Sequence, residues 1–251
     1  MTSPSPSPPL SPSPPPLGRP YLYRGEGTGR WQAFAWFAGS ILSRILALLL
    51  FRLRIRGKAN LPHDGGVLLV TNHQSFLDPW LIGTAANRQV HYMARDTLFR
   101  GGFLQYLGEL LNAFPIKRGR ADLTAIRTAV ERLDKGYMVN IFPEGTRTDD
   151  GAIGAVAPGM VLILGRCKKP IPIQPVVIDG AFEAWPRTAK FPRPLSIRIK
   201  FGQIIPATTW RQWSAEELAR NVRREMVKLQ LELGSEHAEA SQRKLGEQLF
   251  L

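Results

Sequence analysis

The sequence predicts an α/β fold in which helices cover a mostly parallel central sheet, preceded by an N-terminal membrane-associating helix. From residue 65 onward, short apolar runs alternate with amphipathic stretches. This alternation is typical of βα units and of a parallel sheet covered on both faces. A long apolar segment that ends in arginines comes before it. The chain has one cysteine, Cys167, which excludes an intramolecular disulfide and a cysteine-rich zinc site.

Residues 1–30 are predicted to form a disordered tail and linker. Prolines and serines dominate residues 1–20, a composition that favours extended chain over a packed core. The region has no basic start followed by an apolar run, so it does not resemble a secretory signal.

Residues 31–56 are predicted to form the membrane-associating helix. The segment is apolar, but Arg44 lies near its middle, and an arginine at a bilayer centre costs roughly 2.5–3.5 kcal/mol. A helix lying in one leaflet fits the segment better. It has a stripe of small and polar residues along one side, and its basic end suits anionic lipid. The stripe contains Ser40, Ser43, Arg44 and Ala47, and the basic end contains Arg52, Arg54 and Arg56. A helix buried in the protein's own core and a true transmembrane span are the alternatives.

Residues 57–234 are predicted to form the main domain. Strands are expected at 67–71, 90–94, 114–117, 137–142, 171–178 and 195–201. Helices are expected at 75–85, 103–111, 121–135, 159–166 and 214–233. Residues 235–251 are polar and are expected to be a fraying C-terminal tail.

The formal net charge of +13 indicates an anionic partner. Nucleic acid, an anionic membrane surface and phosphorylated substrates all meet this requirement. The basic residues do not alternate with aromatic ones as they do in a platform for stacked bases, so no nucleic-acid partner is predicted.

The stretch TNHQSFLDPW, residues 71–80, holds a candidate acid–base pair. Imidazole acts readily as a base near neutral pH, and a carboxylate on its other nitrogen fixes the tautomer. The spacing of His73 and Asp78 suits a histidine before a helix and an aspartate in its first turn. The alternative is an ordinary helix start, capped by Asn72 or Ser75, with an exposed His73. The other histidines have no convincing ligand spacing with His73, so no metal site is predicted.

A second motif, FPEGTR, occupies residues 142–147. Gly145 lets the backbone approach a ligand closely, and Arg147 offers a planar fork of donors for a phosphate. A carboxylate repels phosphate, so Glu144 is expected to bond a substrate hydroxyl or to orient an arginine. A tight surface turn with a weak Glu–Arg pair is the alternative.

Arg95 and Arg118 follow two further strand ends, which predicts a basic cleft. In open α/β sheets, functional groups gather beyond the carboxyl ends of the strands. If the strands at 67–71 and 137–142 are near neighbours, the two motifs converge on one pocket.

These motifs together resemble those of the glycerolipid acyltransferase family, most closely its 1-acyl-glycerol-3-phosphate acyltransferases. NHQSFLD matches the Asn-His-X4-Asp signature of that family. FPIKRG, FPEGTR and IPIQPVVI resemble its second, third and fourth blocks, in the same order. The resemblance covers roughly residues 52–210, and four ordered blocks are far more specific than one.

The resemblance implies that residues 57–234 are an acyltransferase domain. It would move a fatty acyl group from acyl-CoA or acyl-carrier protein, as co-substrate, to lysophosphatidic acid, giving phosphatidic acid without a further cofactor. His73 would act as general base, oriented by Asp78, with no covalent acyl-enzyme. The substrate would be bound by Arg95, Arg118, Glu144, Gly145, Thr146 and Arg147. The protein is expected at the cytoplasmic face of a membrane; another lysolipid acceptor, or non-catalytic binding of a lipid phosphate, is the alternative.

Overall fold

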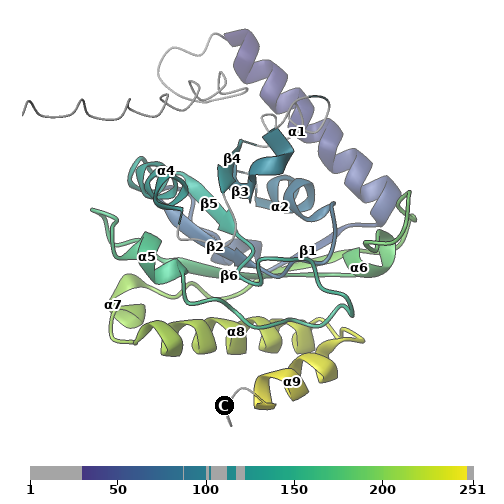
Figure 1. Cartoon of the computed structure of the whole chain (residues 1–251). Helices are drawn as coiled ribbons and strands as arrows, with labels where there is room; N and C mark the ends of the chain where they lie inside the picture. The colour runs from purple at the N-terminus through teal and green to yellow at the C-terminus, as the bar shows by residue number, and fades with distance from the viewer. Residues whose placement is uncertain (1–29, 87, 100–101, 103–111, 117–121, 248–251) are drawn as a thin grey trace, which may run out of the picture.

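The computed structural model describes residues 30–86, 88–99, 102, 112–116 and 122–247, and these form one mixed sheet with flanking helices (Figure 1). Within these residues, the order of the strands in the sheet is β1-β7-β6-β2-β5-β3-β4. Neighbouring strands run parallel except β6 and β7, which are antiparallel. The predicted mostly parallel sheet is confirmed. The strands are β1 (Arg54–Arg56), β2 (Val67–Thr71), β3 (Val90–Arg95), β4 (Ala113–Ile116), β5 (Met138–Ile141), β6 (Ile173–Asp179) and β7 (Arg198–Phe201).

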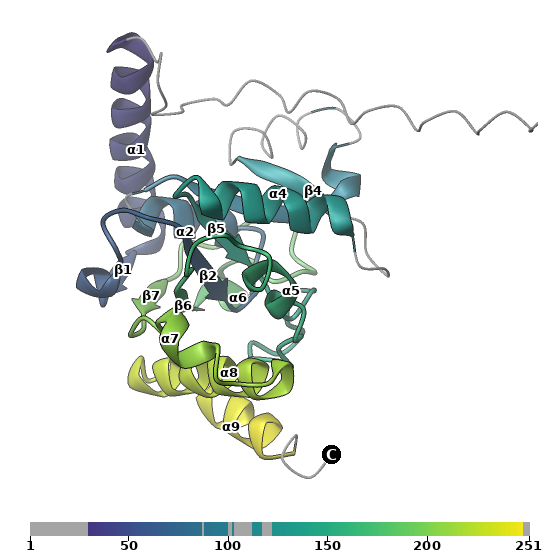
Figure 2. The ribbon, with the colours of Figure 1, turned by 90° about the vertical axis from the view of Figure 1, so that its left-hand side faces the viewer.

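Helices cover both faces of the sheet. Figures 1 and 2 show α1 and α2 on one side and α8 and α9 on the other. The described helices are α1 (Arg30–Phe51), α2 (Asp78–Ala86), α4 (Leu123–Asp134), α5 (Met160–Leu164), α6 (Ala181–Ala184), α7 (Ala207–Trp210), α8 (Ala215–Glu232) and α9 (Ala238–Glu247). The helix expected at 103–111 lies outside the described residues.

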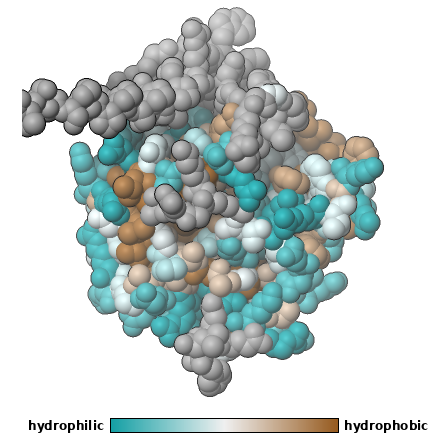
Figure 3. Space-filling view, viewed as in Figure 1, coloured by the Kyte–Doolittle hydropathy of each residue, from teal (hydrophilic) through white to brown (hydrophobic). Residues whose placement is uncertain are grey.

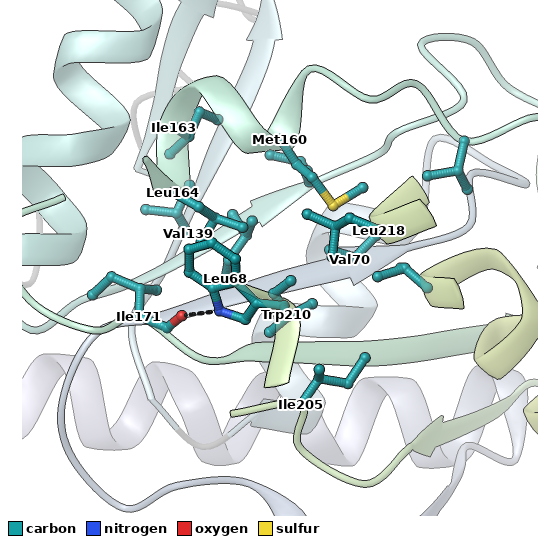
Figure 4. Close-up of a cluster of buried hydrophobic side chains, with 14 of the residues drawn as sticks. Leu68, Val70, Val139, Met160, Ile163, Leu164, Ile171, Ile205, Trp210 and Leu218 are labelled. Carbon is teal, nitrogen blue, oxygen red and sulfur yellow. Dashed lines mark hydrogen bonds between the residues drawn. The ribbon is translucent and has the colours of Figure 1, made fainter. Parts of the chain in front are cut away.

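The central strand β2 is buried on both faces, which explains its apolar run from Val67 to Val70. Because successive side chains point to opposite faces, Leu68 and Val70 pack in the cluster formed with α4, α5 and α8. Val67 and Leu69 pack in the cluster formed with α1, α2 and α6. Figure 4 shows part of the first cluster, in which the indole N–H of Trp210 donates to the carbonyl of Ile171 at 2.8 Å.

The N-terminal helix ends earlier than predicted. It stops at Phe51 rather than at residue 56, and Arg52 adopts a left-handed φ of 45°. Residues 54–56 then form β1, which pairs in parallel with β7. Side chains of a strand alternate between its two faces, and this segment follows that alternation. The arginines on either side of Ile55 are exposed, while Ile55 packs on the core. No helix in the described part of the chain is long and apolar enough to cross a membrane.

The C-terminal segment is more ordered than predicted. Instead of a frayed tail, residues 238–247 form α9, which packs against α8. The buried hydroxyl of Ser241 donates to Gln230 of α8 at 2.6 Å and accepts from the backbone N–H of Ile153 at 2.8 Å. The polar composition therefore hid a set of specific buried contacts.

Candidate active site

His73 and Asp78 lie in direct contact between β2 and α2. The Nδ1 atom of His73 is 2.7 Å from Oδ2 of Asp78, which is the first residue of α2. Asp78 is fully buried, and the same oxygen accepts from the backbone N–H groups of Gln74 at 2.6 Å and Ser75 at 2.8 Å. The expected geometry, a histidine before a helix and an aspartate in its first turn, is what the structure shows.

The contact defines which nitrogen of His73 is free to react. A carboxylate oxygen that accepts from two backbone N–H groups is an acceptor for Nδ1 also, so Nδ1 carries the proton. Nε2 is then the proton acceptor. The imidazole stacks on the ring of Phe142, with centroids 4.1 Å apart, and its side chain remains 20% exposed. The contact with Asp78 therefore orients the imidazole, which keeps access to solvent.

The FPEGTR loop lies beside His73 because β5 is the direct neighbour of β2. Glu144 accepts from the backbone N–H of His73 at 2.9 Å and from that of Gly154 at 2.8 Å, one with each carboxylate oxygen. The backbone N–H of Thr148 donates to the carbonyl of His73 at 2.8 Å. The two motifs therefore converge, as the sequence predicted for neighbouring strands.

Glu144 makes two contacts that the sequence did not predict, one from a backbone N–H group to each of its carboxylate oxygens. Its role in binding the substrate stays a prediction. Burial raises the pKa of the Glu144 carboxyl, and the hydrogen bonds from Gly154 and His73 oppose that shift. The carboxylate thus holds the loop that carries His73.

Arg147, in the FPEGTR loop, has an unsatisfied donor. Its guanidinium carbon lies 3.7 Å from the centroid of the Phe76 ring. Within the described residues, its buried Nη1 has no hydrogen-bond partner. Burial and the nearby Arg187 lower the pKa of Arg147. A buried donor without an acceptor costs free energy, so this group can gain from an anionic ligand.

The other predicted binding residues occupy less enclosed positions. Gly145 has a φ of 69°, which favours glycine, but an added Cβ would meet nothing within 4 Å; Gly145 and Thr146 are both exposed. Arg95 is exposed at the end of β3, separated from β2 by β5. Arg118 lies outside the described residues. In the described part of the chain, no three His, Cys, Asp or Glu side chains gather into a metal site.

Two amide side chains around His73 were missed in the sequence. Asn72 exchanges two 2.8 Å hydrogen bonds with the backbone of Ile178 in β6, so it is not a helix cap. Gln74 donates to the carbonyl of Gly151 at 3.1 Å and accepts from the N–H of Phe182. Both side chains are buried. Their position on either side of His73 was the only signal, because their partners are distant in sequence.

Comparison with known proteins gives a consistent set of matches. The family model described as acyltransferase matches residues 52–179. A 1-acyl-sn-glycerol-3-phosphate acyltransferase of Bacillus subtilis (strain 168) is 32% identical over 45% of this chain and 57% of its own length. A chloroplastic 1-acyl-sn-glycerol-3-phosphate acyltransferase of Arabidopsis thaliana is 26% identical over 68% of this chain and 47% of its own. The chain thus spans about half the length of these relatives.

A solved structure is similar over most of the chain. The crystal structure of the 1-acyl-sn-glycerophosphate acyltransferase PlsC from Thermotoga maritima has a TM-score of 0.70 and 25% sequence identity. The similarity covers 87% of this chain and 86% of that one. The sheet and its flanking helices are therefore shared with that protein.

Proposed function

The chain belongs to the acyltransferase family, and from this premise we propose that it transfers a fatty acyl group from an acyl thioester to the free hydroxyl of lysophosphatidic acid. The product is phosphatidic acid. Similarity to proteins named 1-acyl-sn-glycerol-3-phosphate acyltransferases supports this acceptor. The observation that carries the proposal is the contact between His73 and buried Asp78, because binding alone requires no oriented base.

The proposed reaction is direct transfer. Nε2 of His73 takes the proton of the acceptor hydroxyl as the hydroxyl oxygen attacks the thioester carbonyl, and Asp78 stabilises the imidazolium. When the tetrahedral intermediate collapses, the carbon–sulfur bond breaks and His73 returns the proton to the leaving thiolate. General base catalysis of this kind contributes about 10²–10⁴-fold.

Two side chains that could have formed an acyl-enzyme are engaged elsewhere. Cys167 is buried, and burial raises the pKa of its thiol to about 11. The hydroxyl of Ser75 donates to the carbonyl of Trp185 at 3.0 Å. Neither is positioned as a nucleophile activated by His73, which supports a mechanism without a covalent intermediate.

We assign the acceptor phosphate to Arg147. Its buried, unpartnered Nη1 would donate a charge-assisted hydrogen bond to a phosphate oxygen. The ring of Phe76 fixes the guanidinium plane from one side. Gly145, Thr146, Arg95 and Arg118 remain proposed contributors to the same site.

We further propose that α1 lies in one leaflet of a membrane. Three residues of its predicted small and polar stripe face the protein: Ala47 is fully buried, Ser43 accepts from the indole N–H of Trp80 at 2.8 Å, and Arg44 donates to the carbonyl of Thr84 at 3.5 Å. Arg44 is thus turned toward the protein, away from any lipid that covers the outer face.

The outer face of α1 is apolar. The exposed large hydrophobic residues on its described part are Ile41, Leu42, Ile45, Leu46, Leu48, Leu49 and Leu50. Figure 3 shows hydrophobic surface at the upper right, on the side where α1 lies in Figure 1. A contiguous apolar surface of this kind is typical of a membrane or protein contact. The single cysteine suits a reducing compartment, so we propose the cytoplasmic face.

The test is a panel assay on the full chain bound to vesicles. Each of several lysolipids is offered with labelled acyl-CoA or labelled acyl-carrier protein, and the product is identified by mass. We expect phosphatidic acid from lysophosphatidic acid, and none from the His73→Ala variant. Transfer to a different lysolipid, and not to lysophosphatidic acid, would show that the proposed acceptor is wrong. Phosphate-dependent lipid binding without transfer, by a folded chain, would favour the non-catalytic alternative.

A further inference from the structure

The loop between α6 and β7, residues 185–195, presents an apolar tip to solvent. Phe191 is 79% exposed, and every residue from 190 to 196 is exposed. Single exposed hydrophobic residues are ordinary on protein surfaces. In this loop, however, three further features indicate that the exposed tip is a contact surface: the charge of the loop, its rigidity and its position.

Cations surround the tip without any acidic residue. The loop contains Arg187, Lys190 and Arg193, and no aspartate or glutamate lies within residues 185–195. Arg187 makes one ion pair outside the loop, at 3.7 Å to Asp149, and both side chains are largely exposed. An aromatic side chain between basic residues suits the boundary between acyl chains and anionic headgroups.

The loop is held in shape by its own hydrogen bonds. The indole N–H of Trp185 donates to the carbonyl of Ala189 at 3.0 Å, and the backbone N–H of Arg193 donates to the carbonyl of Ala184 at 2.6 Å. Prolines at 186, 192 and 194 restrict the backbone further. Phe191 is therefore presented by a preformed loop, which lowers the entropy lost on binding.

The two ends of the loop are hydrogen-bonded to two other parts of the protein, the loop that carries His73 and the end of α1. At one end, Trp185 accepts from the hydroxyl of Ser75, and its ring lies 5.8 Å from that of Phe76. At the other end, the N–H of Ile197 donates to the carbonyl of Phe51, the last residue of α1, at 2.9 Å. The tip thus projects from a segment that runs between the loop of His73 and the apolar helix.

We propose that residues 185–195 are a second membrane contact, in which Phe191 enters the leaflet that holds α1 while the loop cations meet anionic headgroups. The inference rests on the proposed placement of α1 in a leaflet. A single helix leaves the protein free to rotate about its axis, whereas a helix and a loop together fix the orientation. The loop of His73 then faces the surface from which a lysolipid arrives.

A lipid surface is favoured over an acidic protein partner because the hydrogen bond from Ile197 to Phe51 ties this loop to the end of α1, which carries exposed leucines. An acidic acyl-carrier protein would suit the three cations, but it offers no acyl-chain layer for the exposed leucines of the neighbouring helix. The two occupants give different results in the following experiment.

The experiment measures the depth of position 191 in the full chain. A thiol-reactive fluorophore is attached to Phe191→Cys; the natural Cys167 is buried, and its pKa of about 11 keeps it unreactive at neutral pH. The matched control is Leu123→Cys on α4, where the leucine is 65% exposed. On anionic vesicles, we expect quenchers in the lipid acyl chains to reach the label at 191 and not the label at 123.

Substitutions measure how much the side chains of the loop contribute to vesicle affinity. We expect Phe191→Ser to weaken vesicle binding about tenfold, and Leu123→Ser to leave it unchanged. Lys190→Gln together with Arg193→Gln should weaken binding about fivefold or more on anionic vesicles at low salt, and not on zwitterionic ones. Equal effects of Phe191→Ser and Leu123→Ser would contradict the proposal.

Two outcomes of the labelling would also overturn it. One is a label at 191 that aqueous iodide still quenches fully when the protein is bound to vesicles. The other is a label that vesicles leave unchanged but purified acyl-carrier protein shields, which would make the loop a protein-docking surface. Neither readout requires acyl transfer, so a failure of the loop is distinguishable from a failure of the proposed enzyme activity.

Discussion

The backbone N–H of His73 donates a 2.9 Å hydrogen bond to Oε1 of Glu144, which joins the loop after β2 to the loop after β5. The other oxygen of Glu144 holds Gly154 in the segment that follows. One carboxylate therefore fixes the backbone of the loop that carries His73. We infer that Glu144 is a positioning residue for His73.

Glu144→Gln is expected to lower kcat about tenfold while leaving the acceptor KM nearly unchanged. The amide keeps one acceptor but turns an N–H donor toward a backbone N–H, at a cost of about 1–3 kcal/mol. Steady-state kinetics with the acceptor varied separates the two parameters. A large rise in acceptor KM at constant kcat would instead place Glu144 on the substrate, as the sequence alone suggested.

Asp78→Asn is expected to lower kcat by about 10³-fold or more, with little change in the KM of either substrate. The asparagine can present its N–H₂ group to Nδ1, which would favour the tautomer with the proton on Nε2 and remove the base. Circular dichroism provides the control for folding, because Asp78 also accepts from two backbone N–H groups at the start of α2. Wild-type kcat in a folded variant would remove Asp78 from the mechanism.

The local features of the site could be predicted from sequence, but their long-range contacts could not. β2 is apolar from Val67 to Val70 because it is central, and the His73–Asp78 spacing reports a loop that enters a helix. The partner of Glu144 is 71 positions away and that of Asn72 is 106 positions away. Such hydrogen bonds depend on which strands become neighbours, and residue types along the chain do not specify this.

The sequence pattern did not distinguish helix from strand at residues 53–56, or a helix from a frayed tail at residues 238–247. Leu53 to Arg56 continues an apolar helix pattern, yet alternation around Ile55 and pairing with β7 make it a strand. The C-terminal segment has weak apolar character, and its helix depends on the fit of Ser241 between Gln230 and Ile153. Tertiary contacts decided the outcome in both cases.

Replacing Leu42, Leu48 and Leu49 together by glutamine is expected to reduce vesicle binding about 100-fold or more without destabilising the fold. These side chains are exposed, so their burial is available only to the membrane, and each contributes about 1.5–3 kcal/mol there. Co-flotation with vesicles measures binding, and thermal unfolding in mild detergent measures stability. The matched inward control, Phe51→Ala, should lower stability because Phe51 is a core residue. Unchanged flotation of the triple variant would refute α1 as the anchor.

Stability should fall with decreasing pH because of His91. Burial and the neighbouring Arg132 lower the pKa of His91 to about 3. An unfolded chain takes up a proton near pH 6.5 and the folded one does not, so the contribution of this residue to stability is complete above pH 7 and decreases below it. Between pH 7 and pH 5 the loss should be about 2 kcal/mol.

Urea unfolding at several pH values measures this slope. The control is His91→Asn. In the wild type, Nη1 of Arg132 lies 2.7 Å from Nδ1 of His91. Asparagine keeps an acceptor for this guanidinium but cannot be protonated. Its stability should vary less between pH 7 and pH 5 than that of the wild type. Identical slopes for the two proteins would show that His91 titrates normally in the fold.

Arg147→Lys is expected to raise the acceptor KM about tenfold while leaving the donor KM nearly unchanged. A lysine ammonium cannot reproduce two parallel hydrogen bonds to a phosphate, and one charged hydrogen bond contributes about 1.5–3 kcal/mol. Tenfold corresponds to about 1.4 kcal/mol. The flat guanidinium also covers the Phe76 ring at 3.7 Å, so the lysine variant loses this stacked geometry as well.

The discriminating measurement pairs Arg147→Ala with an acceptor that lacks its phosphate. If the unpartnered Nη1 of Arg147 binds the phosphate, the variant should lose activity toward lysophosphatidic acid and little toward the dephosphorylated acceptor. The coupling between side chain and phosphate is then the difference between the two losses. Equal losses for both acceptors would make Arg147 a structural residue, held by Phe76, and the phosphate site would have to be sought at Arg95 or Arg118.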